Sequence, residues 1–159
     1  MSLRRVLEIV SIAGVLVSVW ITAQAMYGRG GLPARVAVHF DAAGNPNAWG
    51  SRGALVALPI TAILLYILMT VVARFPASFN FPVRVTPRTR PRLEALALEM
   101  IACLKAEVVW LFAWIQHVTI ELARSGRGGL SPFFMPVVLT VVLSTVIGYV
   151  VAMRRAGRT

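Results

Sequence analysis

The sequence predicts an all-α integral membrane protein, a bundle of four transmembrane helices with a short ordered extracytoplasmic loop between the first two. The chain has 159 residues, of which 58% are hydrophobic and only 14% are charged. Soluble domains contain about 25% charged residues, and a chain this short has too much surface to bury so many apolar side chains. These numbers exclude an ordinary soluble domain, and we expect a single membrane domain over residues 1–159.

Three stretches are long and apolar enough to be transmembrane helices, since about 20 helical residues cross a bilayer core of ~30 Å. The first is expected at about residues 6–26, and we interpret it as a retained helix because no clear signal-peptide cleavage site follows it. The second is expected at about 53–74. The fourth is expected at about 132–153, with Ser131 as its N-cap and Pro132 as its first helical residue.

A third helix is predicted at about residues 92–123, where charged side chains interrupt the apolar pattern. At 1.5 Å per residue it would extend for roughly 50 Å, which is longer than the bilayer core. We therefore expect residues 102–122 to lie in the membrane and the N-terminal end to project into water. The preceding inner loop, 75–91, contains four prolines and is expected to be extended rather than helical.

The 16 basic and 6 acidic residues give a formal net charge of +10. In a soluble protein this excess would suggest nucleic-acid binding, but here the arginines sort by predicted membrane side. The larger group lies on the side of the two termini, so the positive-inside rule places both termini in the cytoplasm. We expect the bacterial inner membrane and its lipids as the surroundings, and no nucleic-acid partner. The inner group is Arg4, Arg5, Arg74, Arg84, Arg88, Arg90, Arg92, Arg154, Arg155 and Arg158, and the outer group is Arg29, Arg35, Arg52, Arg124 and Arg127.

The outer loop, residues 27–52, has a distinctive residue order. Apolar and polar side chains alternate over residues 36–41, which predicts a short strand. Residues 44–47 form a turn cluster, and Ser51 is expected to cap the second helix. The loop motif comprises Leu32, Pro33, His39, Phe40, Asp41, Gly44, Asn45, Pro46, Asn47, Trp49, Gly50 and Ser51.

On these motif residues and the helices that flank them, the chain resembles the DUF1648 family, a domain of unknown function found in multi-pass bacterial membrane proteins. The resemblance implies a membrane location and a loop held between the first two helices. It also implies a relation to SdpI-type immunity and signal-transduction proteins, although this chain is expected to lack their second half.

A polar stripe runs along the third predicted helix. On a helical wheel its members fall within about 80°, while Lys105 and Gln116 lie far round the helix. In a membrane such a stripe should face the bundle interior or water. It fits either a proton or ion pathway, or interhelical and interface contacts. The stripe comprises Glu99, Cys103, Glu107, Trp110, Trp114, His117 and Glu121.

Four potential metal ligands fall on the outer side, His39 and Asp41 in the loop and His117 and Glu121 at the end of the third helix. Two imidazoles and two carboxylates are a suitable set for Zn²⁺. Alternatively, the histidines form structural hydrogen bonds, because the chain has no compact ligand motif such as H-E-x-x-H. No other cofactor is expected.

These observations favour a non-enzymatic accessory, sensor or immunity-like protein that binds a membrane-protein or peptide partner. Its recognition surface would be shaped by His39, Asp41, Asn45, Asn47 and Trp49. The alternative is a small transporter or ion-coupled carrier that uses the stripe and works as a homo-oligomer. A third hypothesis, a membrane metalloenzyme, rests on the four potential ligands alone.

Overall fold

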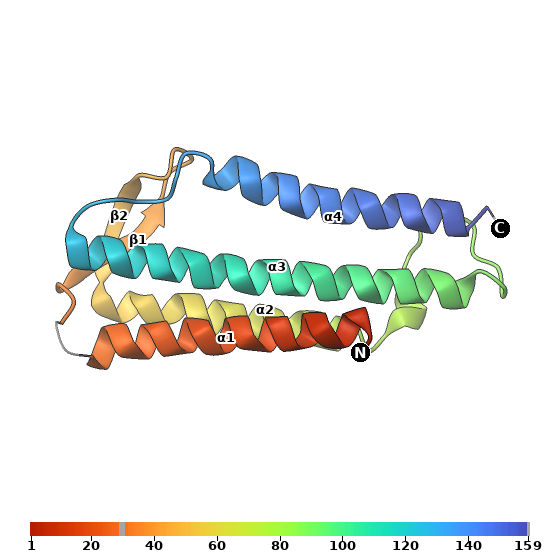
Figure 1. The fold of residues 1–159 in the computed structure, drawn as a ribbon, viewed down its shortest axis with the longest axis horizontal. Coiled ribbons are helices and arrows are strands. Elements are labelled where there is room, and N and C mark those ends of the chain that lie inside the picture. The colour runs from red at the N-terminus through yellow and green to blue at the C-terminus, as the bar shows by residue number, and fades with distance from the viewer. Residues whose placement is uncertain (29–30, 159) are drawn as a thin grey trace.

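Four long helices lie side by side along most of the length of the molecule, and both chain ends lie at the same end of it (Figure 1). The computed structural model describes residues 1–28 and 31–158. The helices are α1 (Leu3–Tyr27), α2 (Ala57–Val72), α3 (Arg90–Ser125) and α4 (Phe134–Ala156). Two short 3-10 helices, η1 (Arg52–Val56) and η2 (Pro76–Ser78), and two strands, β1 (Arg35–Phe40) and β2 (Pro46–Ser51), complete the described elements.

Helix α3 lies centrally and contacts α1, α2 and α4. Its buried face consists largely of small residues such as Ala102, Ala106 and Ala113. The facing side of α1 is also small, with Ser11 and Gly14 among its buried residues. A Cβ at Gly14 would lie 2.8 Å from Cγ1 of Val109. Small side chains let helices in lipid approach closely, which explains why α1 and α3 form the tightest pair.

Helix α4 is apolar and mostly exposed, and it packs mainly along α3. Its C-terminal end is fixed by a cluster in which Met153 and Ala156 meet Leu93 and Ala97 of α3, covered by Phe79 and other apolar residues of the segment before α3. Many of the apolar side chains of α4, such as Val137, Leu139 and Ile147, are exposed, as expected for a helix that faces lipid.

The strands form an antiparallel hairpin beside the end of α3. Val36 of β1 is completely buried and packs with Ala25, Leu55 and Ile120 from three helical elements. The predicted strand at 36–41 is therefore confirmed. Strand β2 was not predicted, because its sequence, Pro46-Asn47-Ala48-Trp49-Gly50-Ser51, lacks the β-branched residues that mark strands. It exists because β1 supplies its hydrogen-bonding partner.

Several predicted element boundaries differ from the structure. Residues 53–56 belong to the 3-10 helix η1 instead of continuing α2. Helix α4 begins at Phe134 and not at Pro132, because Ser131 forms a turn in which its carbonyl oxygen accepts from the Phe134 amide at 2.8 Å. The inner loop, expected to be extended throughout, contains η2.

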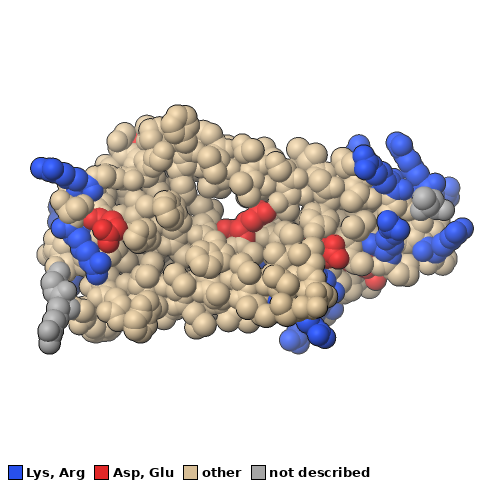
Figure 2. Space-filling model, viewed as in Figure 1, with Lys and Arg blue, Asp and Glu red and all other residues tan. Residues whose placement is uncertain are grey.

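The helices α1 and α4, and the combined span Arg52–Val72, are long and apolar enough to cross a membrane; α3 does not meet the same requirement. Lys and Arg side chains gather at the two ends of the molecule and in a further group on its lower side, and the middle of the visible face carries acidic but no basic side chains (Figure 2). Arg29, assigned to the outer group, lies outside the described residues. Basic side chains gathered at the ends of apolar helices are typical of a membrane protein.

Candidate functional site

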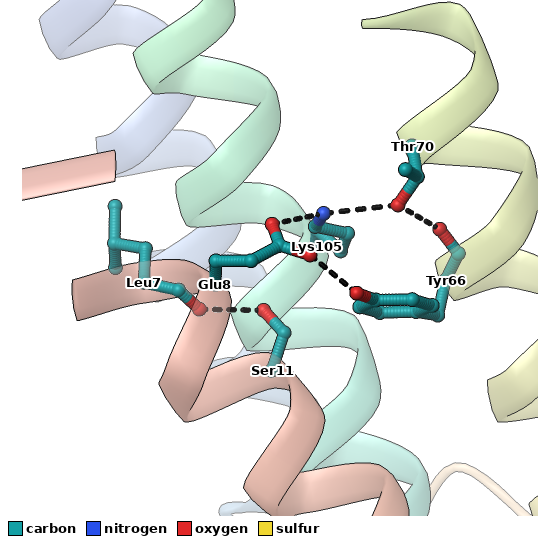
Figure 3. Close-up of polar contacts among 6 residues, drawn as sticks. All are labelled: Leu7, Glu8, Ser11, Tyr66, Thr70 and Lys105. Carbon is teal, nitrogen blue, oxygen red and sulfur yellow. Dashed lines mark hydrogen bonds and ion pairs between the residues drawn. The ribbon is translucent and has the colours of Figure 1, made fainter. Parts of the chain in front are cut away.

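A buried ionic network joins α1, α2 and α3 near the N-terminal end of α1 (Figure 3). Lys105 of α3 is only 4% exposed. Its ammonium group lies 2.5 Å from Oε2 of Glu8 in α1 and donates a second hydrogen bond of 3.0 Å to Oγ1 of Thr70 in α2. A buried ammonium group is tolerated when a carboxylate and further hydrogen bonds compensate it.

Tyr66 completes this network. Its hydroxyl donates to Oε1 of Glu8, and its ring lies 4.6 Å from the Lys105 ammonium, within the range of a cation–π interaction. The Thr70 hydroxyl also donates to the Tyr66 carbonyl oxygen at 2.7 Å. Each polar group of the four-residue network therefore has a partner on another helix or one turn away, and the network fixes the three helices relative to one another.

The sequence interpretation missed this network, since it set Lys105 apart from the polar stripe without a partner and gave Glu8 no role. A signal was present. Lys105 and Gln116 lie far round the helical wheel from the stripe, and the small residues Ala102, Ala106 and Ala113 fall between them and the stripe. In a membrane helix a face of small residues marks the packed side.

Farther along the same interface, the Gln116 amide donates to Oγ1 of Thr22 at 2.8 Å, and Gln116 is completely buried. The indole of Trp110 donates to the carbonyl oxygen of Val10 at 3.0 Å. These bonds continue the attachment of α3 to α1 toward the hairpin end.

The structure divides the predicted polar stripe into two parts. Trp110 and Trp114 are 41% and 54% exposed, and His117 and Glu121 are also exposed. The remaining members, Glu99, Cys103 and Glu107, are half-buried. The stripe is therefore not a continuous path through the bundle interior, because its half from Trp110 to Glu121 is exposed, even though the Trp110 indole is hydrogen-bonded to α1.

The half-buried part of the stripe includes two contacts with α4. Cys103 Sγ lies 3.5 Å from the Tyr149 hydroxyl. The Thr145 hydroxyl donates to Oε1 of Glu107 at 2.5 Å, whereas Oε2 of Glu107 is buried and has no hydrogen-bond partner among the described residues.

Glu107 lines a cavity of about 420 Å³ between α3 and α4. Its walls are otherwise almost entirely apolar and include Leu111, Trp114, Phe134 and Val138. Figure 2 shows an opening between these helices midway along the molecule, with an acidic side chain at its edge. A second cavity, of about 340 Å³, is lined by Arg4, Arg5 and the Glu8–Lys105 pair at the end of the molecule near the N-terminus.

The loop motif forms the hairpin and its attachments. Asp41 Oδ1 accepts from the amides of Ala43 and Asn45, both at 2.9 Å, and so closes the turn. Gly44 has a φ of 86°, and its carbonyl oxygen accepts from the Leu130 amide at 2.9 Å. Only glycine fits there, since a Cβ would lie 1.9 Å from the Leu130 carbonyl oxygen.

Other motif residues are also structural. Leu32 is buried, and Phe40 pairs with Pro46 across the hairpin. A Cβ at Gly50 would lie 2.8 Å from the Val38 side chain, which explains a glycine opposite β1. Ser51 precedes η1, but its hydroxyl caps neither η1 nor α2 among the described residues, so the expected capping role was wrong.

The hairpin also presents exposed polar and aromatic groups. His39 Nδ1 lies 2.6 Å from Oδ1 of Asn47, a hydrogen bond across the two strands. Trp49 is 47% exposed, and its carbonyl oxygen accepts from Arg35 Nη2 at 3.2 Å. Backbone pairing holds these side chains on a rigid surface, which we call the hairpin face and define by Arg35, His39, Asn47 and Trp49.

The four potential metal ligands are not brought together. His39 is bonded to Asn47, and Asp41 closes its own turn. The His117 ring lies 5.8 Å from the Trp114 ring, and Glu121 forms an ion pair of 3.5 Å with Arg124. Within residues 1–28 and 31–158, no group of three or more His, Cys, Asp or Glu side chains is arranged to hold a metal ion. The metal hypothesis thus has no support in the geometry.

Comparison with known proteins identifies one part of the chain. Residues 14–63 match the model of the DUF1648 family, which is described as a domain of unknown function. The match extends from within α1 through the hairpin into α2. No curated protein and no solved structure matches the chain.

Proposed function

Residues 14–63 of this chain belong to the DUF1648 family, and from this premise we propose that the protein is a non-enzymatic bacterial membrane protein that recognises a partner through its hairpin face. The partner is a membrane protein or a peptide. The role is that of an accessory, sensor or immunity-like protein, in which binding at the hairpin is transmitted to the helices.

One observation carries this proposal. The residues of the hairpin face are exposed, and the turn of the same hairpin is hydrogen-bonded to the segment that leads into α4. Trp49 offers a half-exposed aromatic surface of the kind enriched at binding hot spots. The Gly44–Leu130 hydrogen bond lies only a few residues before α4 begins. Because α4 packs mainly against α3, a shift of the hairpin turn has a direct mechanical route to the most weakly held helix.

The proposal includes four membrane crossings with both termini in the cytoplasm. Helix α3 lies alongside three apolar helices (Figure 1), and its most polar inward residues, Lys105 and Gln116, are paired within the bundle. Pairing of this kind is what allows polar residues inside a membrane. In this proposed topology the hairpin face lies on the outer side of the inner membrane.

Topology is tested with single cysteines in a Cys103→Ser background, at Ala43 in the hairpin turn and at Arg88 before α3. We expect a membrane-impermeant maleimide to label Ala43→Cys in intact cells and Arg88→Cys only after lysis. Labelling of both positions in intact cells, or the reverse pattern, would contradict the four-span orientation.

Partner recognition is tested with a photoreactive amino acid at Ala48, an exposed position beside Trp49. We expect one discrete cross-linked product in native membranes, which Trp49→Ala abolishes. Trp20→Ala is the matched control, because Trp20 is 64% exposed on α1 and lies outside the hairpin face. If no product forms, or if Trp49→Ala leaves it unchanged in a folded protein, the proposal fails.

A second candidate function, a small ion-coupled carrier that works as a homo-oligomer, is favoured by the half-paired Glu107 beside its cavity. Its test is uptake of radiolabelled or fluorescent substrates and of protons into liposomes. A transport signal that Glu107→Gln abolishes supports the carrier; a signal that Glu107→Gln leaves unchanged contradicts a role for this carboxylate.

A further inference from the structure

The Glu107 carboxylate is only partly compensated by its neighbours in the described structure. Oε1 accepts from Thr145, but Oε2 is buried without a hydrogen-bond partner. None of the ion pairs among residues 1–28 and 31–158 includes Glu107. A carboxylate inside a membrane raises the free energy unless a hydrogen-bond donor or a cation compensates its charge. A positively charged or hydrogen-bond-donating group is therefore expected to bind beside Glu107.

The cavity beside Glu107 restricts what that group can belong to. Its volume is about 420 Å³, and its lining is apolar apart from Glu107 and Ser131. A small hydrated cation would find one carboxylate and too few further oxygen ligands to replace its water shell. A neutral lipid chain would fill the apolar space but leave Oε2 unpaired. An apolar molecule with a positive centre satisfies both features.

The aromatic side chains of the lining add a second attraction. Trp114, Phe133 and Phe134 border the same cavity, and aromatic faces attract organic cations when water is excluded. The opening between α3 and α4 (Figure 2) lies in a part of the visible face without basic side chains, so a ligand dissolved in the bilayer reaches it without passing a Lys or Arg.

We propose that the cavity between α3 and α4 is a binding site for a lipophilic cation, an ammonium or phosphonium centre on an apolar body, with Glu107 as its counter-ion. Thr145 holds one carboxylate oxygen in place, and the Glu107 side chain itself lines the cavity. The site is separate from the hairpin face and does not depend on the partner proposed for it. Binding also does not require transport, so the site stands even if the carrier function fails.

The test is equilibrium binding to the full chain in nanodiscs of zwitterionic lipid, with empty nanodiscs subtracted. The probe is tetraphenylphosphonium, and tetraphenylborate is its counterpart of the same shape and opposite charge. We expect saturable binding of the phosphonium to the wild type and at least a tenfold loss of affinity in Glu107→Gln. Tetraphenylborate binding should not weaken in that variant.

Glu94→Gln is the matched control, since Glu94 is also on α3 but lies in an ion pair with Arg90 away from the cavity. It should leave phosphonium binding unchanged. Val138→Trp, which fills the cavity and retains the carboxylate, should weaken binding as strongly as Glu107→Gln and covers the case in which the latter fails to fold. The proposal is overturned if the wild type shows no saturable binding, if Glu107→Gln or Val138→Trp retains full affinity, or if Glu94→Gln loses as much.

Discussion

The two sides of α3 differ in how fully their charged side chains are paired with neighbouring helices. On the side facing α1 and α2, Lys105 is almost completely buried and is paired with Glu8 and Thr70. Two residues later, on the side facing α4, Glu107 has one hydroxyl partner and one unpaired oxygen at the edge of a cavity.

This difference comes from the neighbouring helices and not from α3 itself. Helix α1 has Gly14 and serines against α3, so the two backbones come close and polar groups can reach one another. Helix α4 has bulky side chains such as Phe134 and Val138, which border the cavity instead of closing it. Three helices thus form a tight unit, and the fourth leaves space for a ligand or a movement.

The largest effect on this comparison is expected from Glu8→Ala. It leaves the Lys105 ammonium buried without its carboxylate, which should lower the free energy of unfolding by about 3 kcal/mol. This value is the lower end for a broken buried ion pair, because the Glu8 side chain is 38% exposed. The measurement is denaturant titration of helicity in micelles. Glu94→Ala, which breaks an exposed pair with Arg90, should change stability by less than about 0.5 kcal/mol. Equal losses in the two variants would show that the network does not stabilise the bundle.

An intermediate effect is expected from Gly14→Leu, which forces α1 away from Val109. Overpacking of this kind lowers stability by about 1–3 kcal/mol. The matched variant is Gly148→Leu in α4, where a Cβ meets nothing within 4 Å and stability should stay within about 0.5 kcal/mol. Thermal unfolding of the two proteins side by side measures the contrast. A Gly14→Leu protein as stable as the wild type would refute the close approach of α1 and α3.

The smallest effect is expected from Glu107→Leu. Replacing a half-paired acceptor with an apolar group of similar size is nearly neutral, and the Thr145 hydroxyl can turn to a carbonyl oxygen one turn back in its own helix. The free energy of unfolding should therefore change by less than about 1 kcal/mol in the same titration. A loss as large as that of Glu8→Ala would mean that Glu107 holds α4 in place.

Much of the fold follows from local sequence. The uncharged stretches predict the three apolar helices to within a few residues, and the alternation at 36–41 predicts β1. Sequence patterns were less reliable for elements whose conformation depends on contacts with another part of the chain. Ser51 has the residue type of a cap but forms no capping bond among the described residues, and β2 forms only because β1 lies beside it.

The candidate sites were predicted in part. The loop motif lies within the residues that match the DUF1648 model, and several of its members, such as Asp41 and Gly44, build the hairpin. Glu107 was named as one member of the stripe, and the structure places it at a cavity. The partnership of Glu8 with Lys105 was missed because the two residues lie 97 positions apart, and helical periodicity carries no information on which helices become neighbours.

The sequence by itself determined that the chain has the apolar helices of a membrane protein, that its basic residues gather at the helix ends, and that a turn-forming DUF1648 loop joins the first two helices. Hydropathy, charge and turn chemistry are properties of short segments, so a single chain displays them. Only the tertiary structure decided which face of α3 is buried, which of its charges is paired, and where a cavity remains. Those outcomes depend on the size of side chains on other helices, because close approach requires small residues on both partners.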